Sequence, residues 1–314
     1  MTTPDILAVD DAAIERAATL IRAGQCVAVP TETVYGLAAD ATSGAAVARI
    51  YAAKGRPSFN PLIVHVASAA DAARLAELSP VAMQLADAFW PGPLTLVLPA
   101  RPGSAVATLA TAGLGTVAIR VPAGAAMQAL IAASGRPLAA PSANASGRLS
   151  PTTAAHVVAS LDDRVPLILD GGATRHGLES TIVAVTDGKL RLLRPGPITP
   201  DAIERAAGIR VSTHYGDAIE APGQLASHYA PGKPLRLAAT DRRAGEWLIG
   251  FGSIAGDDTL SATGDLVEAA ARLFDALHRA DASGAAAIAV APIPNRGLGL
   301  AIEDRLRRAA TPPD

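Results

Sequence analysis

The stretch KGRPSFNPLIVHV, residues 54–66, sets a lysine and an arginine between a predicted helix and a predicted buried strand. Before it, apolar residues recur at helical spacing between Ser43, a good N-cap, and Gly55, which tolerates the left-handed conformation that ends helices. After the cations, LIVHV is a short and almost wholly apolar run, which is typical of a buried strand. A helix that leads through a polar loop into such a strand indicates an α/β fold.

The same alternation continues on both sides of this stretch. Apolar runs predict strands at CVAVP (26–30), LTLVL (94–98), VAIRV (117–121) and PLAAP (137–141). Alanine-rich segments of helical period predict helices at about 11–23, 69–78, 81–89, 125–133, 152–161 and 200–207. Between them, TETVYGLAADA (31–41) is predicted to be a polar loop beyond the carboxyl end of a strand, where open α/β sheets bind ligands.

A hairpin and a change of composition complete the predicted organisation. Asp187-Gly188 between two apolar runs predicts a two-residue type I′ turn, and therefore an antiparallel pair in a mixed sheet. From 211 to 234 the chain is rich in Gly, Pro, His and Tyr and has no apolar period. We therefore expect a main domain at 1–210, a linker or lid at 211–234, and a small α/β domain at 235–314. The small domain would contain strands at 235–239, 246–252 and 285–293 and helices at 264–279 and 298–309.

Composition narrows the class of protein. With 50% hydrophobic and 18% charged residues the chain can bury large cores, and a net charge of −2 disfavours a broad polyanion-binding face. The single cysteine, Cys26, lies in an apolar run, so it is expected in the core, and neither an internal disulfide nor a thiolate zinc site is possible. No leader and no window of 18 uncharged apolar residues is evident, which predicts a cytoplasmic protein without membrane contact.

The cations of the opening stretch are the first candidates for a binding site. No phosphate-binding P-loop occurs, so side-chain cations and loop amides would have to hold any phosphate. Lys54 and Arg56 could neutralise and clamp a polyphosphate, although such a pair at a helix end is commonly just solvated. His65, directly downstream, could face the same cavity or be a packed core residue.

Hydroxyl-rich loops supply the remaining candidates. Thr31, Thr33 and Tyr35 offer hydroxyls that could bind a ligand or only their own turn. The loop SANASGRLS (142–150) contains Ser142, Asn144 and Ser150, which suit a phosphate or ribose but equally a plain turn. Weaker indications of a binding site, each taken on its own, are GLESTIV (177–183) and LLRPG (192–196).

Eight motifs in order resemble the YrdC-domain family of threonylcarbamoyl-AMP synthases in its two-domain form. They are PTETVYGL, KGRPSFNPLIVHV, WPGPLTLVL, VAIRVP, PSANASGRLSPT, ESTIV, RPG and HYAPGKP. The resemblance covers essentially the whole chain. It implies a twisted, open mixed sheet around a concave site, followed by a smaller Rossmann-like domain.

The resemblance also implies an activity and a set of contacts. ATP, bicarbonate and L-threonine would give threonylcarbamoyl-AMP and pyrophosphate for tRNA modification, with Mg²⁺ carried mainly by ATP because no dedicated carboxylate cluster for a metal appears. A downstream tRNA threonylcarbamoyl transferase is implied, and weak RNA binding is possible.

The residues expected to bind threonine are Thr33, His65, Arg120, Ala140 (through its backbone) and Ser180. Those expected to bind ATP are Arg56, Asn60, Thr116, Ser142, Asn144, Ser150, Arg194, His228 and Tyr229. Lys54 and Arg56 are the catalytic candidates, with Lys54 expected between the two substrates and His228 and Tyr229 expected to cover the nucleotide.

Three other functions are compatible with the same residues. The cleft could bind double-stranded RNA without catalysis, although 3% aromatic residues leave few stacking platforms for single strands. It could form a carbamoyl adenylate from carbamoyl phosphate, as in hydrogenase maturation proteins, or it could only sense ATP. Pyrophosphate release that requires both threonine and bicarbonate would distinguish the synthase from all three.

Overall fold

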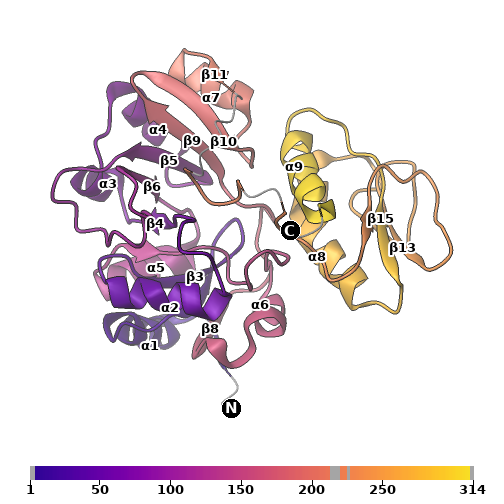
Figure 1. The fold of residues 1–314 in the computed structure, drawn as a ribbon, viewed down its shortest axis with the longest axis horizontal. Helices are drawn as coiled ribbons and strands as arrows, with labels where there is room; N and C mark the ends of the chain where they lie inside the picture. The colour runs from indigo at the N-terminus through magenta and orange to yellow at the C-terminus, as the bar shows by residue number, and fades with distance from the viewer. Residues whose placement is uncertain (1–3, 213–219, 225–226, 312–314) are drawn as a thin grey trace.

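The computed structural model describes residues 4–212, 220–224 and 227–311, which form two lobes of unequal size (Figure 1). The larger lobe is built on an eleven-stranded sheet in the order β1-β8-β2-β3-β7-β4-β6-β5-β9-β10-β11. Its strands are β1 (Asp5–Ala8), β2 (Val27–Pro30), β3 (Tyr35–Asp40), β4 (Ile63–His65), β5 (Leu94–Pro99), β6 (Thr116–Arg120), β7 (Leu138–Ala139), β8 (Leu167–Asp170), β9 (Thr181–Thr186), β10 (Lys189–Arg194) and β11 (Val211–Ser212).

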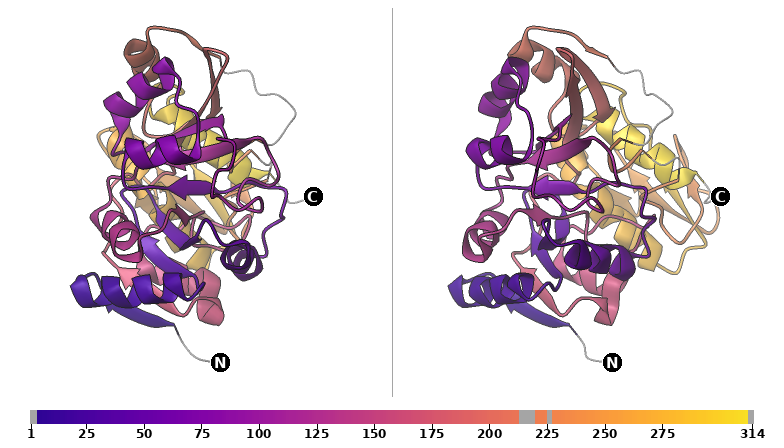
Figure 2. Two further views of the ribbon diagram at one scale, coloured as in Figure 1. Left: turned by 90° about the vertical axis from the view of Figure 1, so that its left-hand side faces the viewer. Right: turned by 60° about the vertical axis from the view of Figure 1, so that its left-hand side comes forward.

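This sheet is mixed, as predicted. β4 pairs with β6 in parallel, whereas β5 and β6, β2 and β3, and β9 and β10 are antiparallel. The β9–β10 turn has φ 52° at Asp187 and 69° at Gly188, the two positive values that a type I′ hairpin requires. The hairpin lies at one end of the larger lobe in every view (Figures 1 and 2).

Helices cover the sheet and begin and end at the expected signals. They are α1 (Asp11–Arg22), α2 (Gly44–Lys54), α3 (Ala69–Leu75), α4 (Pro80–Phe89), α5 (Ala125–Ser134), α6 (Ala154–Leu161) and α7 (Pro200–Ala207), with a short 3₁₀ turn at Asp162–Arg164. The Ser43 hydroxyl caps α2, and Gly55 ends it at φ 59°. Lys54 is therefore the last residue of α2, and Arg56 begins the loop that leads to β4.

The predicted polar loop at 31–41 is wrong over most of its length. Only a tight turn follows β2, and residues 35–40 form β3, every residue of which is buried. β3 lies inside the sheet, antiparallel to both β2 and β7. A strand covered on both faces has no polar alternation, so its period could not be recognised. The structure also contains β1 and β8, which pair with each other and were not among the predicted strands.

The small lobe has a four-stranded, all-parallel sheet in the order β12-β15-β13-β14. The strands are β12 (Leu235–Arg236), β13 (Glu246–Gly250), β14 (Asp258–Thr259) and β15 (Ala287–Val290), and the helices are α8 (Leu266–Ala282) and α9 (Gly299–Ala310). Three strands were predicted, and the two-residue β14 is additional. Among the described residues no helix has the length and apolar character that a membrane span needs.

α8 and α9 lie on the side of the small lobe that faces the larger one (Figure 1). One apolar cluster combines Val34, Leu149 and Leu178 of the larger lobe with residues of α8 and α9. The His278 ring of α8 stacks on the His156 ring of α6, with centroids 3.8 Å apart, and its Nε2 lies 3.1 Å from the Ser150 carbonyl. Of the predicted linker 211–234, Val211–Ser212 form β11 of the larger sheet, and 213–219 and 225–226 lie outside the described residues. The small lobe is thus packed against the loops at 142–150 and 178–180.

Gly196 shows how closely the end of the hairpin approaches these loops. A Cβ atom there would lie 2.4 Å from the Thr181 nitrogen and 2.7 Å from the Glu179 carbonyl oxygen. Since both are backbone atoms, they cannot rotate away. The glycine of the RPG motif therefore allows two backbone segments to lie against each other.

We expect Gly196→Ala to lower the free energy of unfolding by about 1–3 kcal/mol, the usual cost of overpacking. Urea denaturation would measure the loss. Gly115→Ala is the matched control, because nothing lies within 4 Å of a Cβ at that position. Equal stability of the two variants would mean that the close approach at Gly196 does not constrain the fold.

Candidate active site

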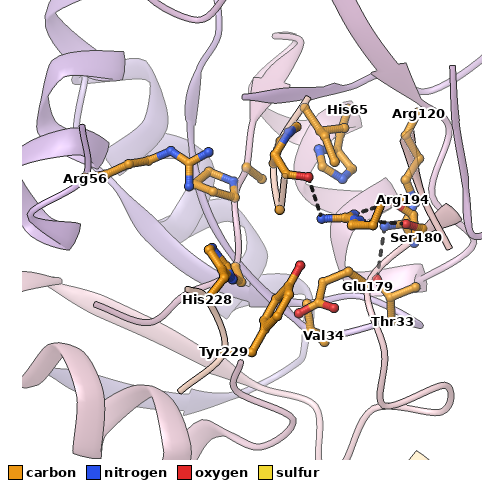
Figure 3. A pocket seen from close by; sticks show the side chains of 16 residues that line it. Thr33, Val34, Arg56, His65, Arg120, Glu179, Ser180, Arg194, His228 and Tyr229 are labelled. Carbon is orange, nitrogen blue, oxygen red and sulfur yellow. Dashed lines mark hydrogen bonds between the residues drawn. The ribbon is translucent and has the colours of Figure 1, made fainter. Parts of the chain in front are cut away.

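One pocket gathers side chains from strand ends and loops that are far apart in sequence (Figure 3). The empty space in it and at its mouth is about 470 Å³. It is lined by Thr33, Val34, Arg56, Ile63, His65, Arg120, Ala140, Pro141, Ser142, Glu179, Ser180, Arg194, Pro222, Gly223, His228 and Tyr229. Ten of the predicted site residues therefore meet in a single hollow, namely Thr33, Arg56, His65, Arg120, Ala140, Ser142, Ser180, Arg194, His228 and Tyr229.

Arg120, at the end of β6, is held in place by the turn between β2 and β3. Its Nη1 donates to the Thr33 hydroxyl at 3.0 Å, and its Nη2 lies 2.6 Å from Glu32 Oε1. Glu32 also accepts hydrogen bonds from the backbone nitrogens of Ala123 and Gly124. Burial alone would raise the pKa of Glu32, but Arg120 and these donors lower it to about 2. Sequence reasoning missed Glu32, which lies between Thr31 and Thr33 in the TETVYGL segment.

Arg194, at the end of β10, is anchored mainly by oxygen atoms of Ser180. Its Nε donates to the Ser180 carbonyl and its Nη2 to the Ser180 hydroxyl, both at 3.1 Å. The same hydroxyl lies 2.8 Å from Thr95 Oγ1. Burial lowers the pKa of Arg194, which is 5% exposed. A guanidinium held mostly by neutral oxygens keeps its charge available to an anionic ligand.

The loop after α2 carries a second buried guanidinium and a free amide. Arg56 donates to the carbonyls of Asn60 and Pro61 at 3.3 and 3.0 Å, and burial lowers its pKa to about 10. Asn60 is 1% exposed, yet neither its Oδ1 nor its Nδ2 has a hydrogen-bonding partner. Since a buried amide without partners is costly, Asn60 is suited to bind a ligand.

His65, on β4, is neutral in this setting. Burial, followed by the charge of Arg120, lowers its pKa to about 3. Its Nδ1 has no hydrogen-bonding partner, and its ring lines the pocket near Arg120 (Figure 3). The alternative of a purely packed core residue is therefore disfavoured, because the ring has both an unsatisfied nitrogen and a face on the hollow.

Lys54 does not line the pocket. Its Nζ donates to the carbonyls of Ser142, at 2.6 Å, and Asn144. Burial, with the charges of Arg56 and Arg164, holds its pKa well below the usual range. Lys54 thus holds the 142–144 backbone against the pocket, and its expected place between the two substrates stays a prediction. It is not a solvated helix end, because its side chain is 3% exposed.

Three further predicted residues, like Asn60, do not line the pocket. Asn144 Nδ2 donates to the Ala145 and Arg148 carbonyls at 2.9 and 2.8 Å, whereas its Oδ1 has no partner. The Ser150 hydroxyl donates to Glu179. Thr116 lies at the opposite end of β6 from Arg120. Because Ala118 is in register with Ile63, Thr116 falls beside the loop that contains Asn60.

The linker covers the hollow with His228 and Tyr229. The two rings meet edge to face at 4.0 Å, and their exposed fractions are 6% and 1%. Burial and the surrounding cations hold the pKa of His228 well below its usual range. Tyr229 adopts φ 62°, an uncommon value for a residue with a side chain, so the backbone here is constrained to present its ring to the pocket (Figure 3).

Comparison with known proteins places this geometry in a family. The family model Sua5_yciO_yrdC, described as "Telomere recombination", matches residues 19–196, and a model described as "Threonylcarbamoyl-AMP synthase, C-terminal domain" matches 198–311. The chain belongs to the Sua5/YciO/YrdC family. Both lobes of this family member are therefore accounted for, and the two-lobed α/β fold expected from its motifs is confirmed.

Full-length relatives of this Sua5-type chain are similar in both sequence and structure. A Pyrococcus abyssi protein named threonylcarbamoyl-AMP synthase is 44% identical over 95% of this chain and 94% of its own. A Bacillus subtilis protein of the same name is 42% identical over 98% and 95%. The crystal structure of P. abyssi Sua5 complexed with L-threonine superimposes with a TM-score of 0.90 at 41% identity, covering 98% of this chain and 97% of that one.

The Glu32–Arg120 pair predicts a pH dependence of stability. A carboxyl whose folded pKa is near 2 stabilises the protein fully above its unfolded value near 4.5. This stabilisation, about 3 kcal/mol at the shift given, is lost as the pH falls from 4.5 towards 2. We expect the free energy of unfolding of Glu32→Gln to be lower than that of the natural protein at pH 7. The difference between the two, called the gap here, should be smaller at pH 3.

Urea unfolding at the two pH values would measure both gaps. Glu15→Gln is the control, because its ion pair with Arg22 is exposed and contributes little. A gap for Glu32→Gln that does not change between pH 7 and pH 3 would contradict the ionised pair.

Proposed function

We propose that this protein is a threonylcarbamoyl-AMP synthase, which converts ATP, bicarbonate and L-threonine into threonylcarbamoyl-AMP and pyrophosphate. The observation that carries the proposal is the convergence of three buried guanidinium groups, those of Arg56, Arg120 and Arg194, in one hollow. Such a hollow suits two anionic reactants that would otherwise repel each other. The names of the full-length relatives and the threonine complex of P. abyssi Sua5 support this reading.

Threonine is proposed to bind at the Arg120 end of the pocket. Arg120 would bind its carboxylate, and the neutral His65 could accept or donate one hydrogen bond through a free ring nitrogen. The Thr33 and Ser180 hydroxyls and the Ala140 backbone lie on the same hollow. A carboxylate held by a buried guanidinium leaves the amine of the substrate directed towards the rest of the pocket.

ATP is proposed to bind towards the Arg56 loop. Arg56 and the free amide of Asn60 would bind phosphate oxygens, with Thr116 beside them, and Arg194 would bind the phosphates nearer the amino acid. Ser142, Asn144 and Ser150 belong to the loop that Lys54 holds through two carbonyls. His228 and Tyr229 would cover the nucleotide from the linker side.

The reaction needs no covalent enzyme intermediate. The amine of threonine combines with bicarbonate and loses water to give an N-carboxylate. One carboxylate oxygen then attacks the α-phosphorus of ATP as the bond to pyrophosphate breaks. Holding the two reactants in line can supply roughly 7–11 kcal/mol of the barrier, and the fixed cations stabilise charge on the phosphates.

Magnesium enters this proposal only as part of the ATP complex. The described residues contain no group of three or more His, Cys, Asp or Glu side chains that could hold a metal. Glu179 is the one carboxylate on the pocket lining, and both of its oxygens already accept hydrogen bonds from Ser150 and Arg305. ATP would therefore supply most of the ligands of the magnesium ion.

The wider setting follows from the same proposal. We place the enzyme in the cytoplasm, where its three small substrates are available, and its product would be consumed by a separate transferase that acts on tRNA. Weak RNA binding by this chain remains a prediction. Pyrophosphate release without threonine, or supported by carbamoyl phosphate in place of bicarbonate, would overturn the assignment.

Arg194→Ala should lower pyrophosphate release in the presence of ATP, threonine and bicarbonate by about a hundredfold or more, because it removes a charge from the phosphates. Lys54→Ala should lose activity by loosening the 142–144 backbone. Lys189→Ala is the matched control on β10, where the side chain is exposed. Circular dichroism would verify folding, and full activity in folded Lys54→Ala would remove that lysine from the mechanism.

Tyr229→Ala should weaken the binding of ATP more than that of threonine, because the ring covers the nucleotide part of the hollow. Calorimetric titration with each ligand separately would measure the two affinities. Equal losses for both ligands would argue against a cover that is specific for the nucleotide.

A further inference from the structure

One arginine of the small lobe reaches the pocket wall. Arg305, on α9, has no exposed surface. Its Nε donates to Glu179 Oε2 at 2.7 Å and its Nη2 to the Pro195 carbonyl at 3.0 Å. Its guanidinium carbon lies 5.0 Å from the centroid of the Tyr229 ring. The remaining contact, from Nη1 to Asp304 at 2.6 Å, stays within α9.

Each partner outside α9 belongs to the pocket or adjoins it. Glu179 and Tyr229 line the hollow, and Pro195 directly follows Arg194, which also lines it. Sequence alone predicted α9 only as a helix of the small second domain. Yet this one side chain connects α9 to the ESTIV segment, the RPG segment and the linker.

Glu179 would be unfavourable in this pocket without a cation beside it. Its carboxylate lines a hollow that is proposed to hold a polyphosphate, so a bare charge would repel the ligand. Burial by itself would raise the pKa of Glu179, but the charges of Arg305 and Arg194 and the hydrogen bond from Ser150 lower it. The carboxyl is therefore ionised, and Arg305 is its direct ion-pair partner.

We propose that Arg305 is a positioning residue for nucleoside triphosphate binding, supplied to the active site by the small lobe. It neutralises Glu179, so that this carboxylate does not offset the charges of Arg56 and Arg194, and it supports the Tyr229 ring by a cation–π contact. This inference rests on the proposed function and adds to it. The nucleotide pocket of the larger lobe becomes complete only when α9 is packed against it.

The test compares Arg305→Met, Glu179→Gln and the double variant by calorimetric titration of the full chain. The ligands are a non-hydrolysable ATP analogue with Mg²⁺ and, separately, L-threonine. Arg305→Met should raise the dissociation constant of the ATP analogue about tenfold or more, because an unpaired carboxylate then faces the phosphates. The threonine constant should change by about twofold or less. The double variant should recover most of the ATP affinity, because it removes the uncompensated charge.

Arg307→Met, an exposed position on the same helix, is the matched control and should bind both ligands as the natural protein does. Glu179→Gln alone should retain or improve the affinity for the ATP analogue. This variant tests the proposal even if Arg305→Met does not fold. Parallel losses for ATP and threonine in Arg305→Met, without recovery in the double variant, would show a structural role only. A tenfold loss in Glu179→Gln would also overturn the proposal.

Different results would contradict the proposed function and the role of Arg305. If the natural protein binds the ATP analogue but releases no pyrophosphate with threonine and bicarbonate, the proposed function is wrong, while the variants still report on Arg305. If the natural protein is active and the variants show no ATP-specific loss, only the role of Arg305 is wrong.

Discussion

Buried positive charge held by neutral oxygen atoms is the constraint on which the rest of this structure depends. Arg56 is anchored by the carbonyls of its own loop, Arg194 mainly by Ser180, and Lys54 by two carbonyls of the 142–144 segment. Carbonyl dipoles orient a cation without cancelling its charge, whereas a carboxylate would cancel it. Buried carboxylates pair with arginines at Glu32, which contacts Arg120, and at Glu179, which contacts Arg305. The hollow therefore retains a net attraction for anions.

The sheet topology is what brings these anchors together. β4 and β6 are parallel neighbours, so His65 and Arg120 are in register at the same edge, although they are 55 positions apart in the chain. The hairpin β9–β10 returns Arg194 to the Ser180 backbone at the start of β9, and Gly196 allows that return to be close. Loops at strand ends are free to carry polar groups while the strands bury their own faces.

Local signals were sufficient for much of the fold but not for the partners within the site. The helix at 200–207 and the turn at Asp187-Gly188 are fixed by caps and by positive φ, both of which a sequence displays directly. β3 was missed because a strand buried on both faces carries no alternation. The direction of the Lys54 side chain and the role of Arg305 depend on segments that meet only in the folded chain. No pattern near either residue indicates what it touches.

The closed linker has a consequence for the fate of the proposed product. Threonylcarbamoyl-AMP is a mixed anhydride, which water hydrolyses, and its carbamate precursor decomposes in bulk solvent. Because His228 and Tyr229 are almost fully buried over the hollow, they would restrict the access of water to the reacting atoms. The contacts of His228 and Tyr229 that retain the nucleotide would then also determine how long threonylcarbamoyl-AMP survives before it is released. The lifetime of the bound product, as well as the rate of its formation, would then depend on His228 and Tyr229.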